Sequence, residues 1–269
     1  MTTESGFPGF PPGTARFLAD LARHNDREWF AANKARYQED VVAPARAFIT
    51  AVGPRLREFA PHVTADPRVN GSLFRQNRDT RFSHDKTPFK THLGLWLWEG
   101  ELERMECSGF YLHVEPPNVM IAAGLYLFPK PLLHAWRESL ANPRHGPALA
   151  RAVAEVQAAG PYKIMGEHYK RLPPGYGAPP ELADWLRYNG LYADIELPMK
   201  GTLESPGFLD LAVQHFRNMA PLHRWLVDMT RRPRVPCRGA GRAGRSPCCR
   251  RTGWCCRQSR NTGSRPGRT

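Results

Sequence analysis

The pattern of apolar and polar positions changes character near residue 89 of this chain. Before that point apolar residues recur at helical spacing, most clearly over residues 14–60. Asn25 precedes Glu28 by three positions, which is the spacing of a capping box at the start of a helix. Pro44 should kink the following helix or begin a new one. The sequence therefore predicts an N-terminal helical region.

A period of two follows, which is typical of strands with one apolar face. Over residues 89–98, Phe89, Thr91, Leu93, Leu95 and Leu97 alternate with Lys90, His92, Gly94, Trp96 and Trp98. A second strand over 108–115 has its apolar face at Phe110, Leu112 and Val114 and its polar face at Tyr111, His113 and Glu115. If the two strands pair, we expect His92 and the second polar face to lie on the same side, with Gly94 leaving an open floor.

Pro116, Pro117 and Asn118 indicate a turn, and the almost wholly apolar run from Val119 to Leu127 predicts a third, central strand. Residues 89–127 are thus expected to form an antiparallel meander, in which the buried positions are Leu93, Leu95, Leu112 and Val114. Helical spacing then returns over 131–140 and 149–156. A Pro- and Gly-rich loop over 171–180 follows, then a short helix over 181–188, a strand over 191–197 and a last helix with Ser205 as N-cap. The predicted fold is a single α+β domain, an antiparallel sheet packed with N-terminal and C-terminal helices.

The end of the chain differs sharply in composition from the rest. Residues 231–269 hold twelve of the 38 basic residues and none of the 25 acidic ones, which leaves the preceding chain with a net charge of +1. They also contain no Leu, Ile, Met, Phe or Tyr, so they cannot bury enough apolar surface to offset the entropy of ordering. We expect a disordered tail or even an out-of-frame reading. The alternatives are a basic nucleic-acid tail or a zinc site formed by Cys248, Cys249, Cys255 and Cys256.

The composition of the body limits its class of function. Cys107 is its only cysteine, which argues against a disulfide framework and for a reducing compartment. The N-terminus has no signal-peptide pattern, and no apolar run has the length of a membrane helix, so we expect a cytoplasmic protein without a membrane partner. The near-neutral body makes nucleic acid an unexpected partner except through the basic tail. There is no Walker loop and no dinucleotide fingerprint, so no cofactor is predicted.

Candidate chemistry concentrates in residues 72–92, where five cations face two carboxylates. Arginine forks and lysines bind phosphate or carboxylate groups, and the predicted anion-binding residues are Arg75, Arg78, Arg81, Lys86 and Lys90. The acid–base candidates beside them are His92, Glu115 and His113. The sequence thus predicts a pocket for an anionic small molecule, with or without catalysis.

The same charges support a second interpretation. Asp79 and Asp85 could pair with neighbouring cations in a structural ion network that fixes an irregular loop. Of the metal-binding side chains here, His84, Asp85 and His92 lack a recognised ligand spacing, so no metal site is predicted. A nuclease motif fails as well, because Asp85 directly precedes Lys86 instead of lying two residues before it.

Four segments of the sequence carry a family resemblance. They are FLADLARHNDREWF at 17–30, RDTRFSHDKTPFKTH at 78–92, FYLHVEP at 110–116 and KRLPPGY at 170–176. Together they resemble the DUF2461 family of uncharacterised proteins, over roughly residues 7–228. The resemblance implies a domain over residues 7–230 and no particular activity. The family often has three glycines where this chain has Ala122, Ala123 and Gly124.

Two hypotheses of different class therefore stay open. The first is an anion-binding pocket at the 75–92 loop, in which Arg78 and Arg81 clamp the ligand. The second is a non-catalytic interaction or scaffold module whose charged loop is internally paired. Solvent exposure and partners of Arg78 and Arg81 distinguish the two.

Overall fold

The computed structural model describes residues 6–81 and 83–232. The chain divides into two units, Met1–Arg232 and Pro233–Thr269, and the description covers only the first. The expectations of disorder and of a nucleic-acid tail concern residues 231–269, and that of a zinc site concerns Cys248 to Cys256. Arg231 is the last residue of the final helix, and residues from 233 onward lie outside the described ranges. Within those ranges, no helix is both long enough and apolar enough to cross a membrane.

The N-terminal region is helical, as the apolar spacing predicts. It comprises α1 (Pro12–Arg23), α2 (Arg27–Ala32), α3 (Lys34–Arg36), the π-helical η1 (Tyr37–Val42) and α4 (Ala43–Arg57). Pro44 lies in the first turn of α4, where a missing N–H and a fixed φ are tolerated. The proline therefore begins a new helix, one of the two outcomes expected for it.

The predicted capping box at Asn25 is wrong. The N-cap of α2 is Asp26, whose Oδ1 accepts a hydrogen bond from the Trp29 N–H at 2.7 Å. Asn25 instead pairs with the backbone of Phe89, donating to its carbonyl and accepting from its N–H at 3.0 Å each. The local spacing misled because this side chain is engaged in a contact 64 residues away.

The sheet is antiparallel with strand order β1-β2-β3-β4-β6-β5. Its strands are β1 (Val63–Thr64), β2 (Leu93–Glu99), β3 (Ser108–Glu115), β4 (Asn118–Leu125), β5 (Lys163–Glu167) and β6 (Tyr188–Pro198). The meander β2-β3-β4 and the central place of β4 confirm the prediction. The first strand is shorter than expected, because Phe89 forms only an isolated bridge, with Asn77. The sequence did not indicate β1 and β5, a two-residue strand and a half-exposed edge strand.

The C-terminal half supplies α5 (Lys130–Ala141), α6 (His145–Ala159), the 3₁₀ helix η3 (Pro180–Arg187) and α7 (Phe208–Arg231). A shorter 3₁₀ helix, η2 (Arg104–Glu106), lies between β2 and β3. Ser205 is not the N-cap of the last helix, as expected, because α7 begins three residues later, with Gly207 as its N-cap. Ser205 forms the preceding turn, where its Oγ accepts from the Gly207 N–H at 3.1 Å.

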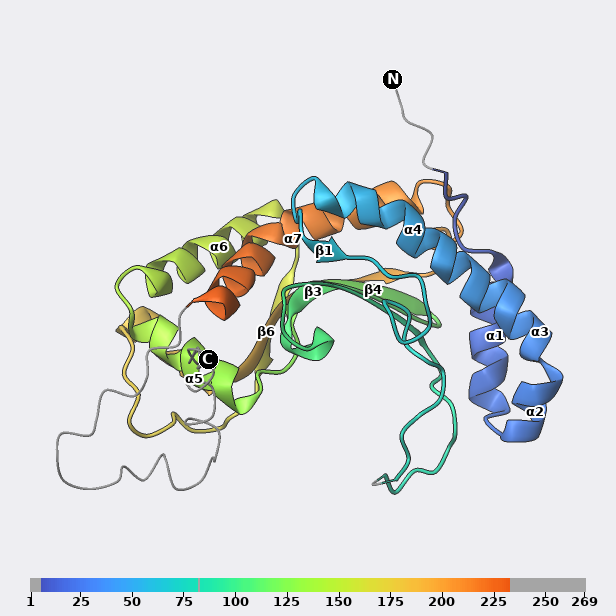
Figure 1. The fold of residues 1–269 in the computed structure, drawn as a ribbon, viewed down its shortest axis with the longest axis horizontal. Coiled ribbons are helices and arrows are strands. Elements are labelled where there is room, and N and C mark those ends of the chain that lie inside the picture. Colours follow the sequence, from blue (N-terminus) through green and yellow to red (C-terminus); the bar gives the residue numbers. More distant parts are fainter. Residues whose placement is uncertain (1–5, 82, 233–269) are drawn as a thin grey trace, which may run out of the picture. The chain divides into compact units, whose positions relative to one another are not determined.

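Residues 6–232 form one α+β domain with its core between the sheet and the helices. Figure 1 shows α4 and α7 running across one face of the sheet, and both contact its strands. The side chains of Leu93, Leu95, Leu112 and Val114 point to that face and are at most 1% exposed. Because a one-residue slip would turn these side chains to the other face, their burial confirms the predicted register.

A buried polar network ties α7 to the ends of β2 and β3. The ring of His223 is fully buried between Ser108 and Glu99, with its Nδ1 2.9 Å from the Ser108 Oγ and its Nε2 3.0 Å from the Glu99 Oε2. Burial lowers the pKa of His223, which is therefore neutral and donates from Nε2 to Glu99. Burial alone would raise the pKa of Glu99, but the hydrogen bond from His223 and the charge of nearby Arg231 lower it.

We expect Leu95→Ala to destabilise the domain by about 2–5 kcal/mol, because the fully buried side chain would leave a cavity. Chemical denaturation measures the free energy of unfolding. Leu127→Ala removes the same atoms from a side chain that is 51% exposed and should change that free energy by no more than about 0.5 kcal/mol. Equal effects of the two substitutions would contradict the register.

The buried imidazole predicts a pH dependence of stability. Only the unfolded chain protonates His223 as the pH falls below about 6.5, so stability should decrease below that pH by up to about 1.4 kcal/mol per unit for this one proton. Glu99, whose pKa is lowered, contributes a further loss of stability only when the pH falls below the ordinary pKa of a glutamate. Denaturant unfolding between about pH 5 and 6.5 should therefore show a shallower slope in His223→Gln than in the wild type. Equal slopes would contradict a neutral buried His223.

Candidate functional site

The face of the sheet opposite α4 and α7, here named the outer face, gathers the candidate ionisable residues. Antiparallel register places Gly94 opposite His113, Trp96 opposite Tyr111, and Ala122 between Tyr111 and Asp194. Alternation along each strand then gives the outer face, which includes Gly94, Trp96, Tyr111, His113, Glu115, Met120, Ala122, Tyr192, Asp194 and Glu196. The pairing of β2 with β3 thus brings together polar groups from both strands, as the sequence predicts.

A chain of hydrogen bonds orients the polar groups of β3. The Nε2 of His113 lies 3.2 Å from the Glu115 Oε2, and its Nδ1 lies 2.9 Å from the Tyr111 hydroxyl. The other oxygen of Glu115 accepts from the Thr91 hydroxyl at 2.8 Å. Burial, followed by the charge of Glu115, raises the pKa of Tyr111 to about 12, so this hydroxyl keeps its proton. Both nitrogens of His113 are therefore committed to defined partners.

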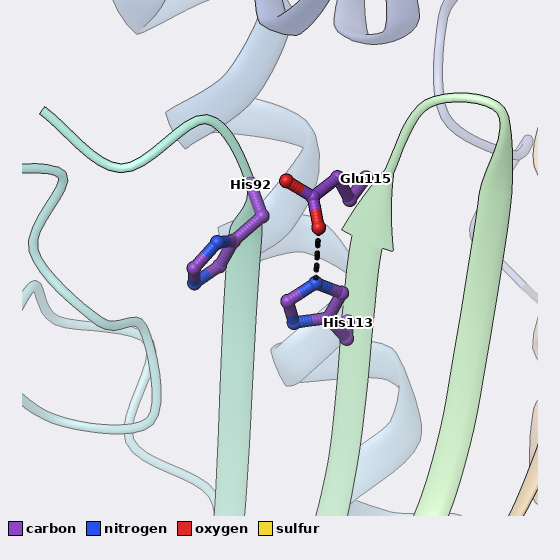
Figure 2. A group of neighbouring side chains, drawn as sticks. All are labelled: His92, His113 and Glu115. Carbon is purple, nitrogen blue, oxygen red and sulfur yellow. Dashed lines mark hydrogen bonds and ion pairs between the residues drawn. The ribbon is translucent and has the colours of Figure 1, made fainter.

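His92 completes the group from the segment just before β2. Its ring centroid lies 4.3 Å from that of His113, and Figure 2 shows both imidazoles with Glu115 on one side of the two strands. Burial, followed by the charge of His113, lowers the pKa of His92 to about 4. The hydrogen bonds from Thr91 and His113 lower the pKa of Glu115 against the opposing effect of burial. At neutral pH the group thus holds an uncharged His92 beside an ionised carboxylate.

Gly94 does not leave the open floor that the sequence suggested. A Cβ built there would meet the Phe74 ring and the Tyr111 hydroxyl at 3.0 Å each. The space above this glycine is therefore occupied by the side chain that holds His113. The absence of a side chain at position 94 serves the packing of Tyr111 and not the entry of a ligand.

The charged loop forms a hairpin-like segment over residues 76–90, here named the arm, which extends away from the sheet in Figure 1. Buried Gln76 holds its base, because the side-chain amide donates to the carbonyls of Lys90 and His92, the latter at 3.1 Å. Phe89 stacks on Phe30 with ring centroids 4.0 Å apart. These contacts fix the segment from Phe89 to His92.

The predicted anion clamps are engaged within the arm itself. Arg78 binds the carboxylate of Asp85 and the hydroxyl of Thr87. Arg81 forms a two-point ion pair with Asp79, at 2.9 and 2.7 Å. The hydrogen bonds from Arg81 lower the pKa of Asp79 to about 2, and those from the Thr87 N–H and then Arg78 lower the pKa of Asp85 to about 2. An external anion would therefore have to displace a carboxylate to reach either guanidinium.

The other predicted anion-binding residues have different surroundings. The Lys86 ammonium donates to the Thr80 carbonyl at 2.9 Å, near the end of the arm. Lys90 lies at its base, with its ammonium 5.1 Å from the centre of the Phe74 ring. Burial, then the charges of Arg75 and Arg104, lowers the pKa of Lys90. Arg75, which is exposed, has no hydrogen bond or ion pair with any residue in the described ranges.

Sequence reasoning missed Arg104, Gln76 and Thr91. Arg104 reaches the site from η2, in the connection between β2 and β3, and its guanidinium lies 4.7 Å from the centre of the Phe74 ring. Nothing in its neighbourhood in the sequence indicates this contact. Gln76 and Thr91 lie inside the charged segment. Alternation placed Thr91 on the apolar face of the first predicted strand, but β2 begins only at Leu93, and the Thr91 hydroxyl binds Glu115 instead.

The fold and this cluster define a class of protein: an α+β domain whose sheet carries an ionisable group on its outer face, flanked by a charged arm. The chain belongs to the DUF2461 family, described as conserved hypothetical protein, whose profile matches residues 13–225. That match runs from within α1 to within α7 and includes the meander and the residues His92, His113 and Glu115. Searches among curated proteins and among solved structures found no match.

We expect Arg78→Ala to leave the melting temperature within about a degree or two of the wild type. Asp85, which would lose its partner, is exposed, and exposed ion pairs contribute little to stability. A thermal melt at low and at moderate salt measures the effect. A loss of several degrees would show that the arm, and not only its base, is part of the cooperative fold.

Proposed function

We propose that this domain binds an anionic small molecule, bearing phosphate or carboxylate groups, at the base of the arm beside the outer face of the sheet. Lys90 is the central contact in this proposal, with Arg75 and Arg104 as the neighbouring cations. The charge of Lys90 acts on His92, and His113 and Glu115 adjoin His92, so all three would contact the same ligand. If the ligand is turned over, we propose that these three residues act as the acid–base groups.

The environment of Lys90 is the observation that carries the proposal. The ammonium is half-buried, and the charged groups that perturb its pKa, Arg75 and Arg104, are both cations. In the described chain no carboxylate pairs with it. Holding like charges together in a partly buried place costs free energy in the folded protein, and an anion placed among them would remove that cost. Ionisable groups with perturbed pKa values cluster at functional sites.

The alternative, a charged loop that only forms an internal ion network, agrees with the outer part of the arm and not with its base. The pairs Arg78–Asp85 and Arg81–Asp79 supply their own countercharge. The cations at the base do not have such partners among the described residues. In this proposal the paired charges fix the shape of the arm, and the cations at its base bind the ligand.

Lys90→Met provides the test. Without ligand, the melting temperature should stay unchanged or rise by up to about 3 °C, because the substitution removes a half-buried charge from a repulsive cluster. Affinity for inorganic phosphate, pyrophosphate or citrate should fall by about 10-fold to 100-fold, which corresponds to one charge-assisted hydrogen bond. Isothermal titration at constant ionic strength measures the affinity.

Lys86→Met is the matched control, because it removes the same charge from the arm near its end. It should leave anion affinity within about two-fold of the wild type, since exposed charges at a distance are screened. The proposal fails if none of the three anions binds more tightly than chloride, or if the two lysine variants lose affinity equally.

A further inference from the structure

We propose that His92, His113 and Glu115 form a binding site for a divalent transition-metal ion, with two imidazole nitrogens and one carboxylate oxygen as ligands. One potential ligand atom from each residue lies within 4.8 Å of the others. Figure 2 shows the three side chains on one side of β2 and β3. This inference goes beyond anion binding and does not depend on it.

The spacing of the group suits a metal ion. Bonds of about 2.0–2.1 Å in tetrahedral geometry separate two ligand atoms by about 3.3 Å. The His113 Nε2 and the Glu115 Oε2 already lie 3.2 Å apart. The third ligand atom would have to approach by at most about 1.5 Å. Side-chain rotation can supply that movement, since His92 is not fully buried and the Glu115 side chain is 47% exposed.

Strand pairing supplies the three ligands, and this explains why the sequence shows no metal motif. His113 and Glu115 alternate along β3, so they share the outer face. His92 directly precedes Leu93, which pairs with Val114, so it comes to lie beside Glu115. The ligands are thus 21 and 2 residues apart in sequence, which is not the spacing of a helical or loop-borne site.

The surrounding hydrogen bonds match those that usually support metal ligands. A ligating histidine generally uses its second nitrogen to bind a protein group, and a ligating carboxylate is itself hydrogen-bonded. Here the Tyr111 hydroxyl lies 2.9 Å from the His113 Nδ1, and the Thr91 hydroxyl donates to the Glu115 Oε1 at 2.8 Å. Both supporting bonds leave the Nε2 of the histidine and the Oε2 of the carboxylate for the ion.

Binding requires one proton rearrangement that the site can perform. In the metal-free hydrogen-bond pattern, the Nε2–H of His113 donates to Glu115 and Nδ1 accepts from Tyr111. A metal at Nε2 needs the other tautomer, with the proton on Nδ1. The Tyr111 hydroxyl can accept from Nδ1–H as readily as it can donate, so it fits both forms.

The test uses the full chain with Cys237, Cys248, Cys249, Cys255 and Cys256 replaced by serine, because thiolates also bind these metals. After dialysis against a chelator, titration with Zn²⁺ by calorimetry and with Co²⁺ by visible absorption should show one site. Zn²⁺ at a hundred times its dissociation constant should raise the melting temperature by about 5–10 °C.

The variants separate the metal site from a simple hydrogen-bonded pair. Glu115→Ala and His113→Ala should weaken Zn²⁺ binding more than about 100-fold, and Tyr111→Phe, which removes only the supporting bond, by about 10-fold to 100-fold. His84→Ala is the matched control, because it removes an exposed histidine from the arm. Lys90→Met should still bind Zn²⁺, which separates this result from failure of anion binding. The inference is overturned if the wild type takes up no ion, or if Glu115→Ala binds it unchanged.

Discussion

The antiparallel pairing of β2 with β3 is the constraint on which the rest of the structure depends. Opposing Leu95 to Leu112 turns the apolar side chains of both strands toward α4 and α7. The same pairing fixes Gly94 opposite His113 on the other face. Because side chains alternate strictly along a strand, burial of the leucines and assembly of the ionisable group are one event. A register slip would cost the core its packing and would also break up the candidate site.

Polar contacts determine where this sheet meets its helices and its arm. At one end, the side chains of Ser108, His223 and Glu99 form a buried network in which each has a hydrogen-bond partner. The network orients α7 without leaving an unpaired charge in the core. Near the other end, Gln76 and Asn25 fix the backbone around Phe89 and His92 through side-chain amides. The segment that precedes β2 and carries His92 is therefore held by side chains from two other parts of the chain.

Periodicity predicted the meander, its register and the helices, because an element that buries one face needs apolar residues at regular spacing along the sequence. It did not predict contacts between distant segments. The amide of Asn25 has the local spacing of a cap but binds Phe89, and Arg104 approaches Lys90 only because η2 folds back over Phe74. The edge strands β1 and β5 were also missed, since a strand that is two residues long or half exposed carries almost no pattern.

The charged segment shows why the number of charges in a sequence is a poor guide to a binding site. Five cations and two carboxylates suggested one cluster, but the structure separates them by partner. Arg78 and Arg81 take the two carboxylates, both on exposed parts of the arm. The half-buried Lys90 lies instead with other cations and next to His92, whose pKa its charge helps to lower. Exposed ion pairs change the free energy of unfolding very little, whereas an unpaired charge in a partly buried place lowers the stability of the folded state. The physical argument for function therefore rests on the base of the arm and the neighbouring imidazoles.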